Sequence, residues 1–136
     1  MNIDTILRVK GRTVHTVSEQ LTVGDAMRRM HDERVSALVV SGDGANIDGI
    51  ISDRGLMNVL VEHGTEVLGR SIGEIMTRKV FTCSRGDSVG AIMALMTDRR
   101  IRHIPVVDDG DLIGIVSMRD LMKVAQVRPA GERSEE

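Results

Sequence analysis

The chain has 136 residues, 41% hydrophobic and 28% charged, which is typical of one globular domain and not of a disordered or fibrous protein. A net charge of −2 and a single aromatic residue, Phe81, argue against a nucleic-acid partner, which needs positive charge and stacking platforms. No apolar run approaches the roughly 18 to 20 residues that span a bilayer, and no leader sequence is evident, so we expect a cytoplasmic protein without membrane contact.

A helix is the first long element that the sequence predicts. Apolar residues recur there at the i, i+3, i+4 and i+7 spacing of one helical face. These residues are Val23, Ala26, Met27 and Met30. Thr22, with Asp25 three residues later, resembles a capping box and marks the start of the helix.

Two strands and a second helix are predicted next. Short runs rich in β-branched residues flank a glycine-rich turn, which is typical of paired strands. The first run is Val35 to Val40, and the second starts at Gly49-Ile50-Ile51. The second helix begins at Ser52 and carries Leu56 inward.

The whole pattern then recurs. Thr16 and Thr82 are 66 residues apart, and the same offset pairs Met30 with Met96, Arg34 with Arg100, and Val40 with Val106. After the turn the offset is 65, and it pairs Gly49 with Gly114 and Ser52 with Ser117. Each copy also begins with three apolar residues at the same spacing, which are Ile3, Ile6 and Leu7 in the first copy and Ile72, Ile75 and Met76 in the second. Three extra residues follow in the first copy, where Lys10-Gly11-Arg12 lies in the longer loop.

This order of elements predicts an α/β fold made of two repeats related by a pseudo-twofold axis. Each repeat is expected to be a small three-stranded sheet with packed helices. We place the repeats at about residues 8–62 and 73–127, within a single module of residues 1–127. Pro105 predicts an edge position or a strand start, because proline cannot donate to a ladder. Residues 128–136 are polar, contain Pro and Gly, and are expected to be disordered.

Motifs in both copies resemble those of the CBS domain family. In the first strands they read Arg34-Val35-Ser36-Ala37-Leu38-Val39-Val40 and Arg102-His103-Ile104-Pro105-Val106-Val107-Asp108. Residues 49–56 read Gly-Ile-Ile-Ser-Asp-Arg-Gly-Leu, and residues 114–121 read Gly-Ile-Val-Ser-Met-Arg-Asp-Leu. The resemblance covers nearly the whole chain and implies a tandem CBS pair, a regulatory module that stands alone here.

By this resemblance, an adenine nucleotide (AMP, ADP, ATP or NAD(H)) binds in the cleft between the repeats. Ser117 is then near phosphate or ribose, and Asp120 binds the ribose hydroxyls. A helix N-terminus at Ser117 favours an anion on physical grounds as well. The further implied contacts are Arg119, Arg102, His103, Ile104 and Pro105, and from across the cleft Val35, Ser36, Ala37, Lys10, Thr13 and His15.

The resemblance implies a second site around Ser52 and Arg54. The residues facing it are Lys79, Phe81, Ile101 and Arg102. Gly55 replaces the ribose-binding acid there, so no carboxylate accepts bonds from the sugar. We therefore expect unequal sites, with the site of Ser117 and Asp120 the stronger.

Other interpretations stay open at this point. Ser117 and Asp120 also have the spacing of a capping box, which serves helix stability alone. The histidines and Cys83 show no metal-ligand spacing, and no activated nucleophile or carboxylate pair predicts an enzyme. The leading hypothesis is a nucleotide sensor that forms a homodimer and signals to an unidentified protein partner. The alternative is a ligand-independent structural or dimerisation module.

Overall fold

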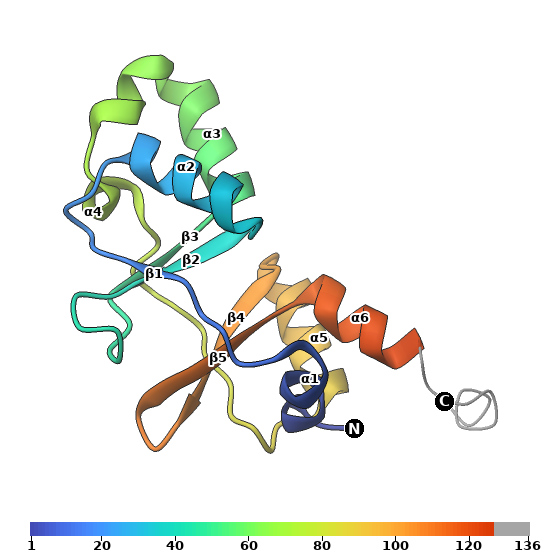
Figure 1. The fold of residues 1–136 in the computed structure, drawn as a ribbon. Helices are drawn as coiled ribbons and strands as arrows, with labels where there is room; N and C mark the ends of the chain where they lie inside the picture. Colours follow the sequence, from blue (N-terminus) through green and yellow to red (C-terminus); the bar gives the residue numbers. More distant parts are fainter. Residues whose placement is uncertain (127–136) are drawn as a thin grey trace. The chain divides into compact units, whose positions relative to one another are not determined.

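Helices and strands follow one another in the order that the repeat predicts (Figure 1). The structure, a computed structural model, describes residues 1–126, so the tail expected at 128–136 lies outside the described residues. The helices are α1 (Ile3–Lys10), α2 (Val23–Glu33), α3 (Asp53–His63), η1 (Thr65–Gly69, a 3-10 helix), α4 (Ile72–Ile75), α5 (Val89–Arg99) and α6 (Met118–Gln126). The strands are β1 (Thr16–Val17), β2 (Ala37–Val40), β3 (Gly49–Ser52), β4 (His103–Asp108) and β5 (Asp111–Ser117). The predicted α/β class is confirmed.

The chain forms two compact units, and neither is one continuous stretch of sequence. Unit 1 contains Met1–Thr13, Thr82–Asp108 and the described residues from Ile113 onward. Unit 2 contains Val14–Phe81 and Asp109–Leu112. Each unit has a hydrophobic core of its own.

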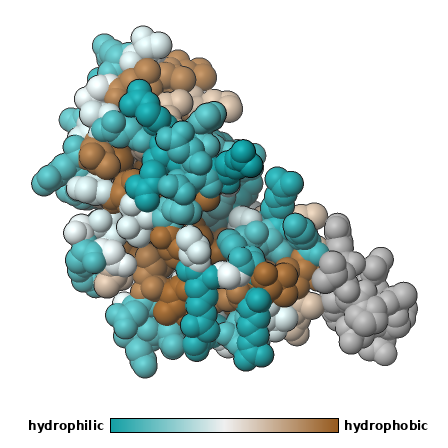
Figure 2. Space-filling model, in the orientation of Figure 1, coloured by the Kyte–Doolittle hydropathy of each residue, from teal (hydrophilic) through white to brown (hydrophobic). Residues whose placement is uncertain are grey.

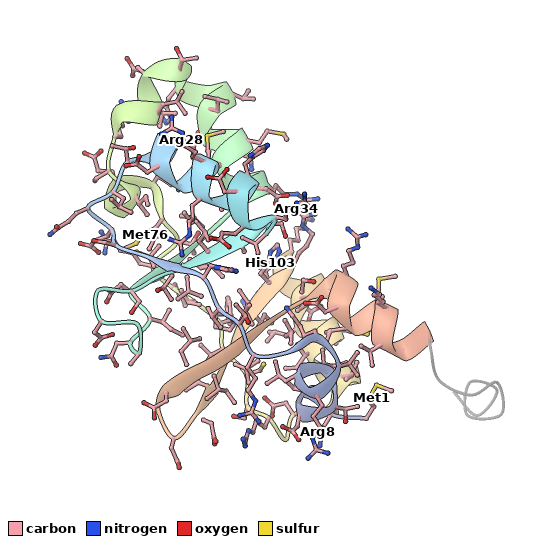
Figure 3. The ribbon with its side chains drawn as sticks, in the orientation of Figure 1. Met1, Arg8, Arg28, Arg34, Met76 and His103 are labelled. Atoms are coloured by element: carbon pink, nitrogen blue, oxygen red, sulfur yellow. The ribbon has the colours of Figure 1, made fainter. Side chains whose placement is uncertain are left out.

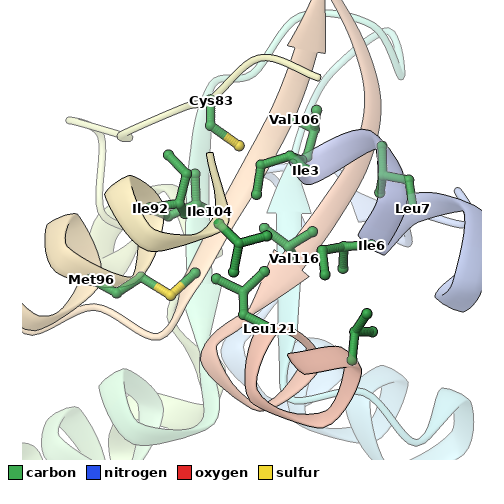
Figure 4. Packing of buried hydrophobic residues seen from close by; sticks show 12 residues of the cluster. Ile3, Ile6, Leu7, Cys83, Ile92, Met96, Ile104, Val106, Val116 and Leu121 are labelled. Carbon is green, nitrogen blue, oxygen red and sulfur yellow. The ribbon is translucent and has the colours of Figure 1, made fainter. Parts of the chain in front are cut away.

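The opening segment of each repeat packs in the unit of the other repeat. Helix α1 precedes the first repeat, yet three of its side chains are at most 1% exposed in the core of unit 1, together with Val116 and Leu121 (Figure 4). They are Ile3, Ile6 and Leu7. Helix α4 precedes the second repeat, yet Ile72 is fully buried in the core of unit 2. The apolar spacing thus predicted buried segments without revealing their partners.

Two glycines at matching positions allow these opening segments to approach a strand. A Cβ atom on Gly114 would lie 2.7 Å from Cδ2 of Leu7, in α1. A Cβ atom on Gly49 would lie 2.6 Å from Sδ of Met76, just after α4. At Gly49 a Cβ atom would also lie 2.9 Å from the main-chain oxygen of Thr77, so packing requires glycine there, whereas at Gly114 the end of the Leu7 side chain would have to move.

The sheet of unit 2 has three strands in the order β1-β2-β3, as predicted for the first repeat. Strand β1 is parallel to β2, with Thr16 opposite Val39. Strand β3 is antiparallel to β2, with Ser52 opposite Ala37. Thr77 adds an isolated bridge to β3, so the segment after α4 closes the far edge of this sheet.

The sheet of unit 1 has only the two strands β4 and β5, so the prediction of three strands is wrong for the second repeat. The cause is Pro105. In unit 2 the N–H of Val39 donates to the carbonyl of His15 at 3.2 Å, and proline at the matching position has no N–H to donate. Cys83 keeps a one-residue parallel bridge to β4, through its N–H to Pro105 at 3.0 Å and its carbonyl to Val107 at 2.8 Å. Pro105 therefore lies in an edge strand, as expected.

Capping side chains begin the helices where the sequence predicts them. Thr22 and Asp25 form the reciprocal capping box of α2. For α5 the cap is Ser88, whose Oγ accepts from the N–H of Ala91 at 3.0 Å. The carboxylate of the preceding residue, Asp87, accepts from the N–H of Ser84 at 2.8 Å.

Two arginines in the left-handed conformation end α2 and α5. Arg34 and Arg100 both have φ of 55°, and Figure 3 shows Arg34 at the end of α2. The N–H of Val35 still bonds back to Met30 at 3.1 Å, so the chain cannot yet pair in the sheet. Strand β2 therefore begins at Ala37, two residues later than predicted, and β4 begins at the matching position, His103.

Hydrophobic residues remain visible among hydrophilic ones on the molecular surface (Figure 2). Exposed large side chains include Met57 and Val61 of α3 and Met122 of α6, with 64%, 80% and 47% exposure. None of the helices within residues 1–126 combines the length and apolarity needed to cross a bilayer.

Candidate functional site

The N-terminus of α6 holds a reciprocal capping box in unit 1. Ser117 ends β5, and its Oγ accepts from the N–H of Asp120 at 3.0 Å. Oδ2 of Asp120 accepts from the N–H of Ser117 at 2.8 Å. The N–H of Met118 donates to the carbonyl of Arg102 at 2.9 Å, which fixes the start of α6 beside the residue that precedes β4. Three residues implied by the family motif are thus brought together.

Lys10 completes this group from α1. Its Nζ donates to Oδ2 of Asp120 at 2.7 Å and to the carbonyl of Ile115 at 2.7 Å. Lys10 was predicted to lie in a loop, but it is the last residue of α1. Gly11 ends the helix with φ of 95°, and its N–H donates to Leu7. A glycine after an apolar helical spacing is the signal that was missed.

Asp120 is a partly buried carboxylate held in its charged form. The side chains of Asp120 and Lys10 are 25% and 28% exposed. Burial alone would raise the pKa of Asp120, but the hydrogen bonds from Lys10 and Ser117 outweigh burial and lower this pKa below its ordinary value. Asp120 is therefore an acceptor at neutral pH.

The matching position in unit 2 has the same main-chain hydrogen bonds but lacks counterparts of Lys10 and Asp120. The N–H of Asp53 donates to the carbonyl of Ser36 at 2.9 Å, and Oγ of Ser52 accepts from the N–H of Gly55 at 3.2 Å. Gly55 supplies no carboxylate. The carbonyl of Ile50 accepts from the N–H of Thr77 at 3.0 Å, where the carbonyl of Ile115 accepts from a lysine in unit 1. The group around Ser117 in unit 1 therefore has a lysine and a carboxylate that the group around Ser52 in unit 2 lacks.

Gly55→Asp is expected to stabilise the protein by about 0.5 to 1.5 kcal/mol. The substitution removes a glycine from the first turn of α3, and it adds a carboxylate that can complete a capping box with Ser52. A Cβ at this position would lie 3.3 Å from Oγ of Ser52, which needs only a small adjustment. Urea unfolding followed by circular dichroism measures the change.

Gly55→Ala is the matched control for this prediction. It removes the same backbone freedom but adds no carboxylate, so its gain in the free energy of unfolding should be smaller. A larger gain for alanine than for aspartate would contradict the capping explanation.

The residues expected to bind nucleotide divide between the two units. Those in unit 1 are Lys10, Thr13, Ile101, Arg102, His103, Ile104, Pro105, Ser117, Arg119 and Asp120. Those in unit 2 are His15, Val35, Ser36, Ala37, Ser52, Arg54, Lys79 and Phe81. The segment from Lys10 to His15 was expected to act with the first copy, but Lys10 and Thr13 belong to the unit that carries Asp120.

These side chains differ in how far they are available to a ligand. Arg102 and Arg119 are exposed, and His103 is half-buried at the start of β4 (Figure 3). Ile104 is fully buried in the core of unit 1, and Pro105 is also buried. Their side chains pack in the protein, so a ligand at the surface of unit 1 would meet their main chain.

The part of the chain that the structure describes bears on two kinds of chemistry, metal binding and thiol chemistry at Cys83. Residues 1–126 contain no group of three or more His, Cys, Asp or Glu placed to hold a metal ion. Cys83 is buried, and burial raises the pKa of its thiol to about 12. At neutral pH this sulfur is a protonated thiol and a weak nucleophile.

Comparison with known proteins gives one family. The family model described as CBS domain matches residues 9–62 and 72–126. A similar curated protein is the mitochondrial CBS domain-containing protein CBSX3 of Arabidopsis thaliana, with 39% identity over 106 residues. The match covers 75% of this chain but only 52% of the plant protein, so the chain spans about half the length of that relative.

Solved structures share the fold. The CBS-domain containing protein ATU1752 from Agrobacterium tumefaciens has a TM-score of 0.87 at 33% identity, covering 91% of this chain and 92% of that one. The CBS domain pair of the protein MJ0100 has a TM-score of 0.80 at 23% identity, covering 93% and 96% of the two chains. That structure is a complex with 5′-methylthioadenosine and S-adenosyl-L-methionine.

Proposed function

Since the chain belongs to the CBS domain family, with both of its repeats matched, we propose that it is a regulatory module that binds an adenine nucleotide. AMP, ADP, ATP and NAD(H) are the ligands to be tested. A ligand regulates such a module by favouring the conformation or oligomer that it binds more tightly. A partner protein then responds to that state. The module itself catalyses no reaction in this proposal.

The observation that carries the proposal is the ionised Asp120 at the start of α6. Its carboxylate is a strong acceptor for ribose hydroxyls. Arg119 is exposed in the first turn of α6, and the carbonyl of Arg102 accepts from the N–H of Met118, so two arginines lie beside this carboxylate. An acceptor for the sugar and cations for a phosphate together suit a nucleotide better than an uncharged ligand.

The ligands bound by MJ0100 support the choice of an adenosine compound. In that protein, a pair of the same fold is in complex with two molecules that each contain adenosine. Its identity to this chain is 23%, so its contacts are not transferred here. Because Gly55 removes the acid from unit 2, we propose that unit 1 provides the stronger contacts.

Asp120→Ala is expected to weaken nucleotide binding by roughly 1.5 to 3 kcal/mol, because hydrogen bonds to a charged group are lost. This corresponds to about a tenfold to 150-fold higher Kd. Isothermal titration with AMP, ADP, ATP and NAD, on the wild type and the variant, measures the change.

Two control variants separate binding from folding. Glu62→Ala removes an exposed carboxylate from α3 and should leave the affinity unchanged. Asp120→Asn keeps an oxygen for the N–H of Ser117 while removing the charge, so it should bind weakly yet lose less stability than Asp120→Ala. No binding by the wild type at millimolar nucleotide would refute the proposal.

The exposed apolar surface supports a second candidate, a dimerisation module. Met57 and Val61 lie four residues apart on α3, so they share one face of that helix, and Met122 repeats the position of Met57 on α6. We propose that a second copy of the chain covers this face. Melting curves separate the two functions, because a nucleotide at 100 times its Kd should stabilise the fold by about 2.7 kcal/mol.

Met57→Glu is expected to raise the dimer dissociation constant at least about tenfold, since a charge would be buried at an apolar contact. Light scattering after gel filtration should then give the monomer mass of 14.9 kDa at concentrations where the wild type is dimeric. Gln20→Glu, at an exposed position outside α3, should leave the mass unchanged. A wild type that is monomeric at all concentrations would contradict this proposal.

A further inference from the structure

The ion pair of Lys10 and Asp120 has unused hydrogen-bonding capacity on both partners. Oδ2 of Asp120 accepts from Lys10 and from the N–H of Ser117, while Oδ1 accepts from none of residues 1–126. Nζ of Lys10 has three N–H groups, and two of them go to Asp120 and to the carbonyl of Ile115. With 28% and 25% exposure, both side chains can be reached from solvent.

We propose that Lys10 and Asp120 together bind one ribose hydroxyl, which makes Lys10 a specificity residue for ribonucleotides over deoxyribonucleotides. The inference rests on the proposed nucleotide function. A hydroxyl donates one hydrogen bond and accepts others, whereas a carboxylate can only accept. The hydroxyl would donate to Oδ1 of Asp120 and accept from the third N–H of Lys10, so a ligand without it leaves that oxygen and that N–H without a partner.

The structure holds this pair in place before any ligand binds. Lys10 ends α1, whose apolar side chains are fixed in the core of unit 1, and its Nζ is anchored by Ile115. Asp120 is anchored by Ser117 in the capping box. Little side-chain freedom remains to be lost on binding, which favours affinity. In unit 2 the acid is absent and Thr77 occupies the matching carbonyl, so the preference for ribose belongs to unit 1.

Titration with AMP, 2′-deoxy-AMP and 3′-deoxy-AMP tests the inference through the ratio of their dissociation constants. The wild type should prefer AMP over at least one deoxy form by about tenfold to a hundredfold. Lys10→Met, which keeps the aliphatic stem, should reduce that preference at least fivefold, which is about the usual net contribution of one hydrogen bond. Lys123→Met removes an exposed lysine from α6 and should leave it unchanged.

A lysine that serves only the fold would give a different result. Lys10→Met would then weaken AMP and both deoxy forms by the same factor, and the unchanged ratio would overturn the inference while leaving the proposed function in place. If the wild type binds none of AMP, ADP, ATP and NAD, the proposed function fails and the inference fails with it.

An experiment without ligand tests the pair itself. Carbon-detected NMR can follow the titration of the Asp120 carboxyl group in the wild type and in Lys10→Met. Burial raises the pKa of Asp120 and the hydrogen bond from Lys10 lowers it. Without Lys10, the pKa of Asp120 should therefore rise in the variant. Equal pKa values in the two proteins would show that the pair does not form in solution and would overturn the inference.

Discussion

Ile6→Ala is expected to destabilise the second repeat by about 2 to 5 kcal/mol, although Ile6 precedes the first repeat. The side chain of Ile6 is fully buried in the core of unit 1, and its truncation leaves a cavity among residues of α5, α6 and β5. Urea unfolding measures the loss, as a lower midpoint with the same slope.

Val9→Ala is the control for this variant, because Val9 lies on the same helix with 65% exposure. Its effect should stay within about 0.5 kcal/mol. Amide hydrogen exchange then locates the damage. Faster exchange is expected in β5, and faster exchange confined to β2 and β3 would contradict the placement of α1 in unit 1.

Ile72→Ala should give the complementary result, a loss of about 2 to 5 kcal/mol that is felt in unit 2. Ile72 is fully buried with Val23, Leu38 and Leu56, all from the first repeat. The amides of β2 and β3 should therefore exchange faster, and the unfolding midpoint in urea should fall.

Glu74→Ala, an exposed substitution on the same short helix, serves as the control and should change the free energy of unfolding by less than about 0.5 kcal/mol. Two outcomes would contradict the packing of α4 in the unit of the first repeat. One is a loss confined to β4 and β5, and the other is an Ile72→Ala protein as stable as the wild type.

The local elements of this fold could be predicted from the sequence because short-range chemistry determines them. The capping box of Thr22 and Asp25, the helical apolar spacing and the glycine-rich turn all act over a few residues. The pairing of α1 with the second repeat could not be predicted in the same way. The spacing of Ile3, Ile6 and Leu7 says that one face is buried, but it does not say against which of two similar cores.

The sheet of unit 1 shows a signal that was present in the sequence but not followed to its consequence. Pro105 predicted an edge strand, and the loss of its N–H also removes the bond that Val39 makes to His15 in unit 2. A repeat with proline at this position retains a bridge at Cys83 where the other repeat has a strand.

The candidate site was predictable in its composition more than in its connections. The family motif indicated Ser117 and Asp120, and their capping geometry follows from a spacing of three residues. The bonds from Lys10 join residues 110 and 105 positions apart, and such contacts depend on the path of the whole chain. Once Lys10 is assigned to α1, its approach to Asp120 follows from the packing of α1 in unit 1.

Because α1 packs in the unit of the second repeat and α4 in the unit of the first, the two units differ in when they can fold during synthesis. Nearly all of unit 2 has been made once the ribosome passes Phe81, whereas unit 1 needs both α1 and strands that are made last. Helix α1 is therefore made before unit 2, and its apolar face stays exposed to solvent until β5 and α6 are made. Closing so long a loop slows folding, so the group of Ser117, Asp120 and Lys10 in unit 1 is expected to form after unit 2.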